Sequence, residues 1–199
     1  MDTVAGRRLR PSPKQLKKLL LWVGFAVVLF LLLMVGSHRL LTQADRKTEM
    51  SWQQIRRLVQ RQLDLVSELT PLVANAPPEF TKPLRLLKET HQALQQQHGA
   101  LARSVSVTPD QLRDYEKAQE AMAASVERVL RTGPGVVGSA GRLSHEWVGC
   151  YRGTQKLLRA EKERYNVSAS AYNRLYGTFF MNWVAEKFHM QGRPLFRKL

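Results

Sequence analysis

An uncharged apolar block near the amino terminus constrains the fold of this chain more than any other feature. Residues 19–37 read LLLWVGFAVVLFLLLMVGS and contain no charged side chain. As an α-helix the block would be about 28 Å long, close to the hydrocarbon thickness of a bilayer. Trp22 stands near one end, where interfacial aromatic residues are enriched. We predict a retained transmembrane helix. The alternative is a cleaved signal peptide, whose apolar region is normally shorter, about 7–15 residues.

Lysine and arginine are unequally divided between the two flanks of this block. The residues before it include Arg7, Arg8, Arg10, Lys14, Lys17 and Lys18, whereas a similar length after it holds Arg39, Arg46 and Lys47. The more basic flank of a transmembrane helix usually stays in the cytoplasm. The sequence therefore predicts a short cytoplasmic basic tail at residues 1–18, a transmembrane helix at 19–37 and an extracytoplasmic domain at 38–199.

Helical periodicity dominates the predicted extracytoplasmic domain. Apolar residues recur every three or four positions over residues 55–72, 84–101, 112–129 and 147–179. Thr108, Pro109 and Gln111 form the expected start of a helix, with a cap, a first-turn proline and a capping-box glutamine. We expect the last helix to run from Ser144 to about His189. The predicted fold is all-α, with the transmembrane helix continuing outward as one rod into an antiparallel, up-down-up-down four-helix bundle.

Two segments carry motifs that recur in a known protein family. The first contains Trp52, Ile55, Arg61, Asp64, Leu65 and Leu69, and the second contains Gly153, Thr154, Tyr165, Asn166, Tyr172, Asn173, Phe179, Asn182, Ala185 and Phe188. In composition and spacing they resemble the LemA family, most specifically in the tyrosine–asparagine pair repeated after seven residues. The chain lacks the family's usual Tyr-Pro-Asp-Leu-Lys segment, so it is similar to a diverged member.

The resemblance implies a bacterial inner-membrane protein with a single span and a periplasmic helical domain. It implies a structural, scaffolding or membrane-organising role through protein partners in the envelope, with no catalytic residues and no cofactor. An accessory or regulatory subunit of a membrane protease or envelope-stress system is the alternative. A hydrolase of envelope polymers is a third, less favoured hypothesis, because no pair of carboxylates or nucleophile with a base stands out. The oligomeric state stays open.

Six polar or aromatic residues stand out because they belong to the matching motifs. They are Arg61, Asp64, Tyr165, Asn166, Tyr172 and Asn173. We expect interhelical polar contacts that set the helix register. A groove for a ligand or partner is the alternative.

The histidines and the single cysteine have unremarkable predicted roles. His91 and His98 are about 10.5 Å apart along a helix, too far to chelate one ion, so we expect hydrogen-bonded histidines near the core. Cys150 falls on an apolar stripe and is predicted to be a core residue. No metal site is predicted.

The excess of basic residues, 31 against 16 acidic ones, raises the question of an anionic partner. The predicted location argues against nucleic acid and favours anionic lipid head groups or acidic envelope polymers. An antiparallel bundle would return the end of the chain to the bilayer, so we predict that residues 177–199 form a membrane-contacting foot. Its candidate lipid-facing residues are Phe179, Phe180, Trp183, Lys187, Phe188, Arg193, Phe196, Arg197 and Lys198. Closure of the bundle end by these aromatic residues is the equal alternative.

Overall fold

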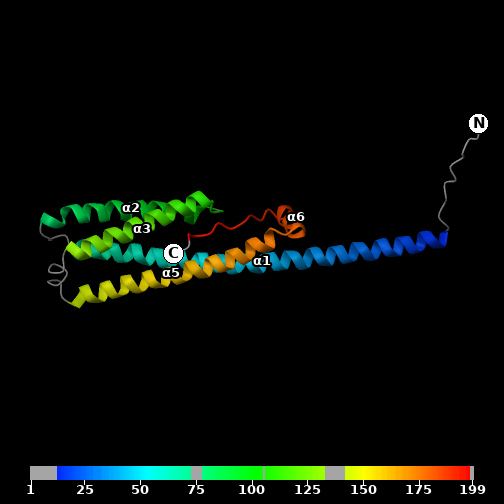
Figure 1. Ribbon diagram of the computed structural model, residues 1–199, viewed down its shortest axis with the longest axis horizontal. Helices are drawn as coiled ribbons and strands as arrows, with labels where there is room; N and C mark the ends of the chain where they lie inside the picture. The colour runs from blue at the N-terminus through cyan, green and yellow to red at the C-terminus, as the bar shows by residue number, and fades with distance from the viewer. Residues whose placement is uncertain (1–12, 73–77, 105, 133–141, 198–199) are drawn as a thin grey trace, which may run out of the picture.

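The computed structural model describes residues 13–72, 78–104, 106–132 and 142–197. Over these ranges the regular structure is all helical, and an extended segment follows the last helix. Figure 1 shows one very long helix with the other helices gathered along the half of it that is farther from the amino terminus. The all-α class predicted from the sequence is confirmed for the described residues.

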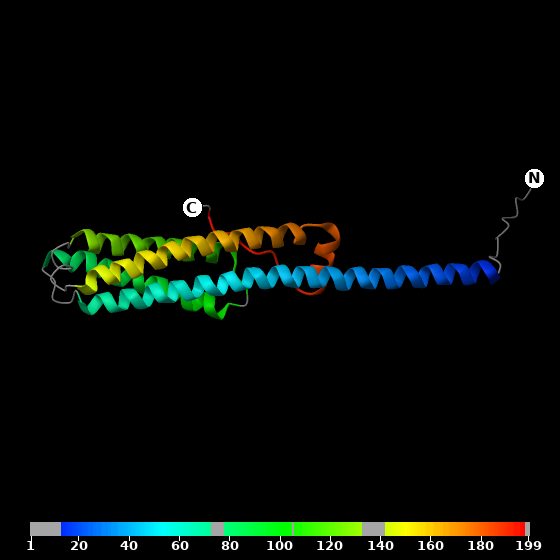
Figure 2. The same cartoon turned by 90° about the horizontal axis from the view of Figure 1, so that it is seen from below.

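The first helix, α1 (Pro13–Leu72), is 60 residues long, or about 90 Å. It contains the whole apolar block and continues without a break into the domain, as predicted. The apolar side chains of the block, from Leu19 to Val35, are mostly exposed. Figure 2 shows this half of α1 extending beyond the other helices. The Asn-Ala-Pro-Pro sequence at residues 75–78 predicts the end of this helix, because proline cannot continue it. This segment falls mostly outside the described residues, and α1 ends at Leu72.

Two helices follow on the same half of the rod. The short 3-10 helix η1 (Pro78–Phe80) leads into α2 (Thr81–Arg103), and α3 (Pro109–Thr132) begins after a short connection. The capping box is confirmed: Gln111 N–H donates to Thr108 Oγ1 at 3.2 Å, and Thr108 N–H donates to Gln111 Oε1 at 3.0 Å.

The predicted last helix is divided in two. It comprises α5 (Arg142–Tyr176) and α6 (Phe179–Lys187), separated by Gly177 and Thr178. Gly177 closes α5 by donating to Asn173 O at 2.9 Å, and a Cβ at Gly177 would lie only 3.3 Å from that oxygen. The expectation of one helix to His189 was therefore wrong, and the break allows α6 to fold back against α1.

One hydrophobic core joins the four long helices. In the domain α1 packs mainly against α5, and α2 mainly against α3. Trp52 of α1 lies near the centre, with its ring 6.1 Å from Tyr115 of α3 and 5.9 Å from Tyr165 of α5. The up-down-up-down order stays a prediction.

A second, smaller cluster lies where α6 crosses α1. Leu41 of α1, Tyr172 of α5, and Val184 and Ala185 of α6 are buried together. Toward the apolar block, the ring of Phe30 contacts those of Phe180 and Trp183, at centroid distances of 6.2 and 5.8 Å. Helix α6 therefore packs on the last turns of the apolar block.

Candidate functional site

The chain reverses direction after α6. His189 adopts a left-handed backbone conformation, with φ of 54°. His189 N–H donates to Glu186 O at 3.3 Å and Met190 N–H to Ala185 O at 2.9 Å, which is the hydrogen-bond pattern of a Schellman motif. This turn sends residues 190–197, which we call the tail segment, back along α5 and α1 (Figures 1 and 2).

Two asparagines of α5 hold the backbone of the tail segment. The Asn173 amide donates to Arg193 O at 2.7 Å and accepts from Arg193 N–H at 2.8 Å. The Asn166 amide likewise donates to Phe196 O at 3.1 Å and accepts from Phe196 N–H at 2.9 Å. Each side-chain amide thus pairs with both backbone groups of one residue, as a neighbouring β-strand would.

Two tyrosines of α5 complete the arrangement. The hydroxyl of Tyr165 donates to Pro194 O at 3.0 Å, and that of Tyr172 donates to Gln191 O at 2.9 Å. Burial raises the pKa of both tyrosines to about 12, so both hydroxyls remain protonated donors at neutral pH. We call these four residues of α5 the Tyr-Asn clamp.

The spacing of the clamp follows from helix and strand geometry. Its two tyrosine–asparagine pairs are seven residues apart, about 10.5 Å along a helix. Their partners, Arg193 and Phe196, are three residues apart, about 10 Å in an extended chain. Because Asn166 binds the later residue and Asn173 the earlier one, the tail segment runs antiparallel to α5. Two tyrosine–asparagine pairs seven residues apart on α5 can therefore bind two tail residues that are three apart.

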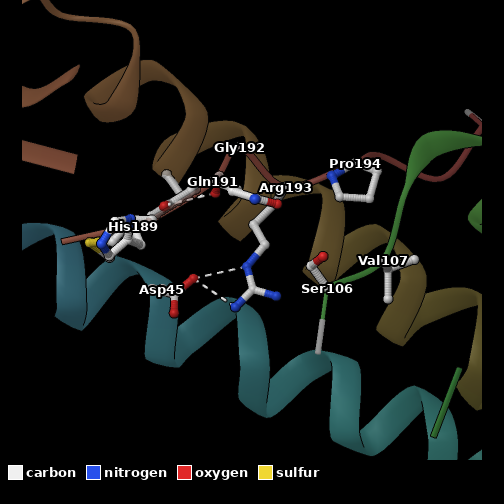
Figure 3. Close-up of a pocket in the computed structure, with 10 residues that line it drawn as sticks. Asp45, Ser106, Val107, His189, Gln191, Gly192, Arg193 and Pro194 are labelled. Carbon is white, nitrogen blue, oxygen red and sulfur yellow. Dashed lines mark hydrogen bonds and ion pairs between the residues drawn. The ribbon is translucent and has the colours of Figure 1, made fainter. Parts of the chain in front are cut away.

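Arg193 connects the tail segment to α1. Its guanidinium contacts Asp45 at 2.9 and 2.8 Å and Glu49 at 3.4 Å. Figure 3 shows the arginine side chain reaching from the tail to Asp45. Burial acts to lower the pKa of Arg193, but the hydrogen bond and charge of Asp45 outweigh it and raise that pKa overall. The contact is a charge-assisted, forked ion pair.

Phe196 inserts into the hydrophobic core at the other end of the tail segment. Its ring lies 5.2 Å from that of Tyr165 and 6.0 Å from that of Trp52. The Lys162 ammonium lies 5.0 Å from the Phe196 ring centroid and pairs with Glu116 at 3.9 Å. Phe196 thus covers a buried charged pair as well as two aromatic rings.

The six motif residues divide into two groups. Tyr165, Asn166, Tyr172 and Asn173 lie together on α5, but they bind the tail segment rather than another helix. Arg61 and Asp64 are exposed, and Asp64 accepts from Gln60 on the same helix at 2.9 Å. The expected interhelical contact of Arg61 and Asp64 was wrong, because their face of α1 turns to solvent.

The predicted lipid-facing residues also divide. Those on α6 or at its end remain on the outside: Phe179, Phe180, Trp183, Lys187 and Phe188 are exposed or half-buried. Phe196 is instead only 3% exposed, and Arg193 is held by α1. The amide of Arg197 donates to Glu116 at 3.4 Å, and Lys198 lies outside the described residues. The predicted foot is therefore shortened, because the Schellman turn diverts the chain after residue 189.

The histidine prediction is confirmed and the cysteine prediction is wrong. His91 contacts Leu63 O at 3.1 Å, and His98 Nδ1 contacts the Tyr115 hydroxyl at 2.8 Å. Burial, with a contribution from Arg56, lowers the pKa of His98. Cys150 is exposed rather than buried. Among the residues that the structure describes, no group of three or more His, Cys, Asp and Glu side chains is placed to hold a metal ion.

The sequence did not predict Asp45, Glu49, Glu116 or Lys162 as site residues. Each lies on a helix face rich in charges, and such residues are usually solvated. Only the return of the tail segment brings the first two onto Arg193, places Phe196 beside Lys162 and brings the Arg197 amide to Glu116.

Replacement of the clamp asparagines should destabilise the domain more than replacement of the exposed motif residues. We expect Asn173→Ala to lower the free energy of unfolding by about 1–3 kcal/mol, because both backbone groups of Arg193 lose their partner. Arg61→Ala, at an exposed position of α1, is the matched control and should change it by less than about 0.5 kcal/mol. Urea unfolding of the full chain in detergent measures both, and equal effects would contradict the assignment.

No protein-family model matches the chain, and no significant match to it was found among the curated proteins.

Proposed function

We propose that this chain is a membrane-anchored protein of the bacterial envelope with a structural, scaffolding or membrane-organising role, exercised through protein partners and the lipid surface. In this proposal residues 19–37 cross the inner membrane once, the amino terminus is cytoplasmic, and the domain is an antiparallel four-helix bundle in the periplasm. Catalysis is not part of the role. The proposal includes membership, as a diverged member, of the LemA family.

The exposed apolar half of α1 is the observation that carries the proposal. The most apolar 18 residues of this stretch have a mean hydropathy of 2.8, and none of them is buried. Exposing so many large apolar side chains to water would be costly, at about 25 cal/mol per Å². A bilayer removes this cost, and the length of the block matches its hydrocarbon thickness.

The position of α6 supports a lipid contact beside the span. Phe180 and Trp183 pack on Phe30, which lies about 10 Å inside the domain-side end of the block. Phe179 is 94% exposed at the start of the same helix. If the block spans the bilayer, these rings reach about 10 Å below the headgroup boundary, the depth to which an amphipathic helix lying in the interface buries its apolar face. The foot in this revised proposal consists of residues 179–188.

The orientation is tested with reporter fusions at Leu199 of the full chain. An alkaline phosphatase fusion should be active and a green fluorescent protein fusion dark, because only the first reporter matures in the periplasm. The opposite pattern would contradict the proposed topology. Co-purification of a stable protease partner from native membranes would instead favour the alternative role as an accessory or regulatory subunit.

Labelling of α6 tests the revised foot. In a Cys150→Ser background, Phe179→Cys carries an environment-sensitive NBD fluorophore, and the chain is reconstituted into phosphatidylglycerol-containing vesicles. We expect blue-shifted emission that spin-labelled lipids quench, because the probe enters the interface. Glu163→Cys, on an exposed position of α5, is the control and should remain in water. The same emission from both positions would contradict the foot.

A further inference from the structure

We propose that the groove between α1 and α5 is a peptide-binding site which the tail segment occupies as an internal ligand. Its external ligand is an extended peptide of another protein, with an arginine followed three residues later by an aromatic residue. The inference rests on the interaction role proposed above and names the class of partner. It is tested in detergent, so its failure leaves the membrane proposal unaffected.

The Tyr-Asn clamp recognises backbone rather than side chains. Its hydrogen bonds end on carbonyl oxygens and amide groups of residues 191, 193, 194 and 196. Such bonds are available to any extended segment that has an N–H group at the two asparagine positions. The same logic applies where a peptide adds to an exposed strand, with backbone bonds giving affinity and side-chain pockets giving specificity.

Two side-chain sites on the domain define the sequence that the groove prefers. Asp45 and Glu49 provide two carboxylates for one guanidinium, and this charge complementarity selects arginine. Trp52, Tyr165 and Lys162 surround one aromatic ring. The interval of three residues between the two sites is imposed by the seven-residue repeat of the clamp. The groove should therefore prefer a peptide in which an aromatic residue follows an arginine by three positions.

The tail segment does not fill the groove. A cavity of about 280 Å³ lies beside it, bounded by Asp45 of α1, by Ser106 and Val107 before α3, and by residues 189–194 (Figure 3). Gly192 of the tail segment lines this cavity and contributes no side chain to it. A Cβ there would lie 3.6 Å from Asn173 Oδ1, an ordinary contact. A competing peptide can therefore carry a Cβ at this position, which the internal ligand lacks.

Competition with the tail segment sets the apparent affinity for an external peptide. A tethered ligand acts at an effective concentration of about millimolar, so a wild-type groove is largely occupied. Weakening the tail without altering the groove should expose the site. Arg193→Ala does this, because Arg193 belongs to the tail whereas Asp45 and Glu49 stay in place on α1.

The experiment measures binding of a fluorescein-labelled peptide, MQGRPLFRKL (residues 190–199), to the full chain in detergent by fluorescence anisotropy. We expect the Arg193→Ala chain to bind it about tenfold more tightly than the wild type, or better. A peptide with alanine in place of its first arginine and its phenylalanine should bind weakly to both. Adding Asn173→Ala to the Arg193→Ala chain should abolish the gain, because the clamp then loses one of its two amides.

A second variant protects the test from a folding defect. Phe196→Leu keeps an apolar side chain in the core but loses the aromatic contacts of the tail, and it should also bind the peptide more tightly than the wild type. Circular dichroism and thermal melting establish that each chain is folded. If Arg193→Ala or Phe196→Leu is folded and binds the peptide no better than the wild type, the groove only holds its own tail and the proposal is overturned.

Discussion

Trp52→Ala should lower the free energy of unfolding of the domain by about 3–5 kcal/mol, the range for removal of a large buried aromatic side chain. The Trp52 indole is 5% exposed and contacts Tyr115 of α3, Tyr165 of α5 and Phe196 of the tail segment. Trp52 therefore joins three separate elements to α1. The cavity left by alanine would loosen all three.

Urea unfolding of the full chain in detergent, followed by near-ultraviolet circular dichroism, measures this effect. Gln54→Ala is the matched control, because Gln54 is an exposed residue of the same turn of α1. It should change the free energy of unfolding by less than about 0.5 kcal/mol. A loss below about 1 kcal/mol for Trp52→Ala would show that these aromatic contacts do not hold the domain together.

Lys162→Met should destabilise the domain by a similar amount, about 3–5 kcal/mol at neutral pH. Lys162 and Glu116 are both buried and pair at 3.9 Å, and methionine keeps the apolar length of the lysine without its charge. The substitution leaves the Glu116 carboxylate buried without a cationic side chain at that distance. Adding Glu116→Gln removes the remaining charge, so the double variant should recover most of the lost stability. Additive losses in the two single variants would contradict a coupled pair.

The pH dependence of this loss has a definite sign. Burial raises the pKa of Glu116, against the opposing effects of the Arg197 amide and Lys162. A carboxyl group with a raised pKa binds its proton more tightly in the folded chain, so its contribution to stability falls as pH rises from the ordinary value toward the folded-state pKa. Lys162→Met removes one opposing charge and raises that pKa further. The deficit of Lys162→Met should therefore shrink as pH is lowered, and a deficit independent of pH would contradict the assignment to Glu116.

Local patterns predicted most of the helical architecture. The uncharged block and the absence of proline and glycine between residues 38 and 70 were enough to predict α1 as one rod, and the capping box at Thr108 marked the start of α3. The stripe positions of His91 and His98 correctly indicated histidines with hydrogen-bond partners. These features depend on residues within one or two helical turns of each other, so the sequence contains them directly.

The break between α5 and α6 was missed because its signal is weak. Gly177 is a single glycine within an otherwise helical pattern, where glycine costs only about 1 kcal/mol relative to alanine. The packing of α6 on residues 30–41 of α1 adds to this small preference for a break, and that packing is not visible in the local sequence. The prediction that Cys150 is a core residue was wrong because a residue at the border of an apolar stripe can face either the core or solvent.

The sequence by itself determined the helical class, the membrane-compatible block and the residues that matter on α5. Periodicity, charge and caps are local properties, and the repeat of tyrosine and asparagine was visible without a structure. Only the tertiary structure decided what that repeat binds. The partners of Asn166 and Asn173 lie 30 and 20 residues away, and Arg193 meets an aspartate 148 positions earlier. Such contacts depend on the turn at His189 and on the direction of the segment that follows it. A local sequence pattern does not specify which distant residues become neighbours after the chain reverses.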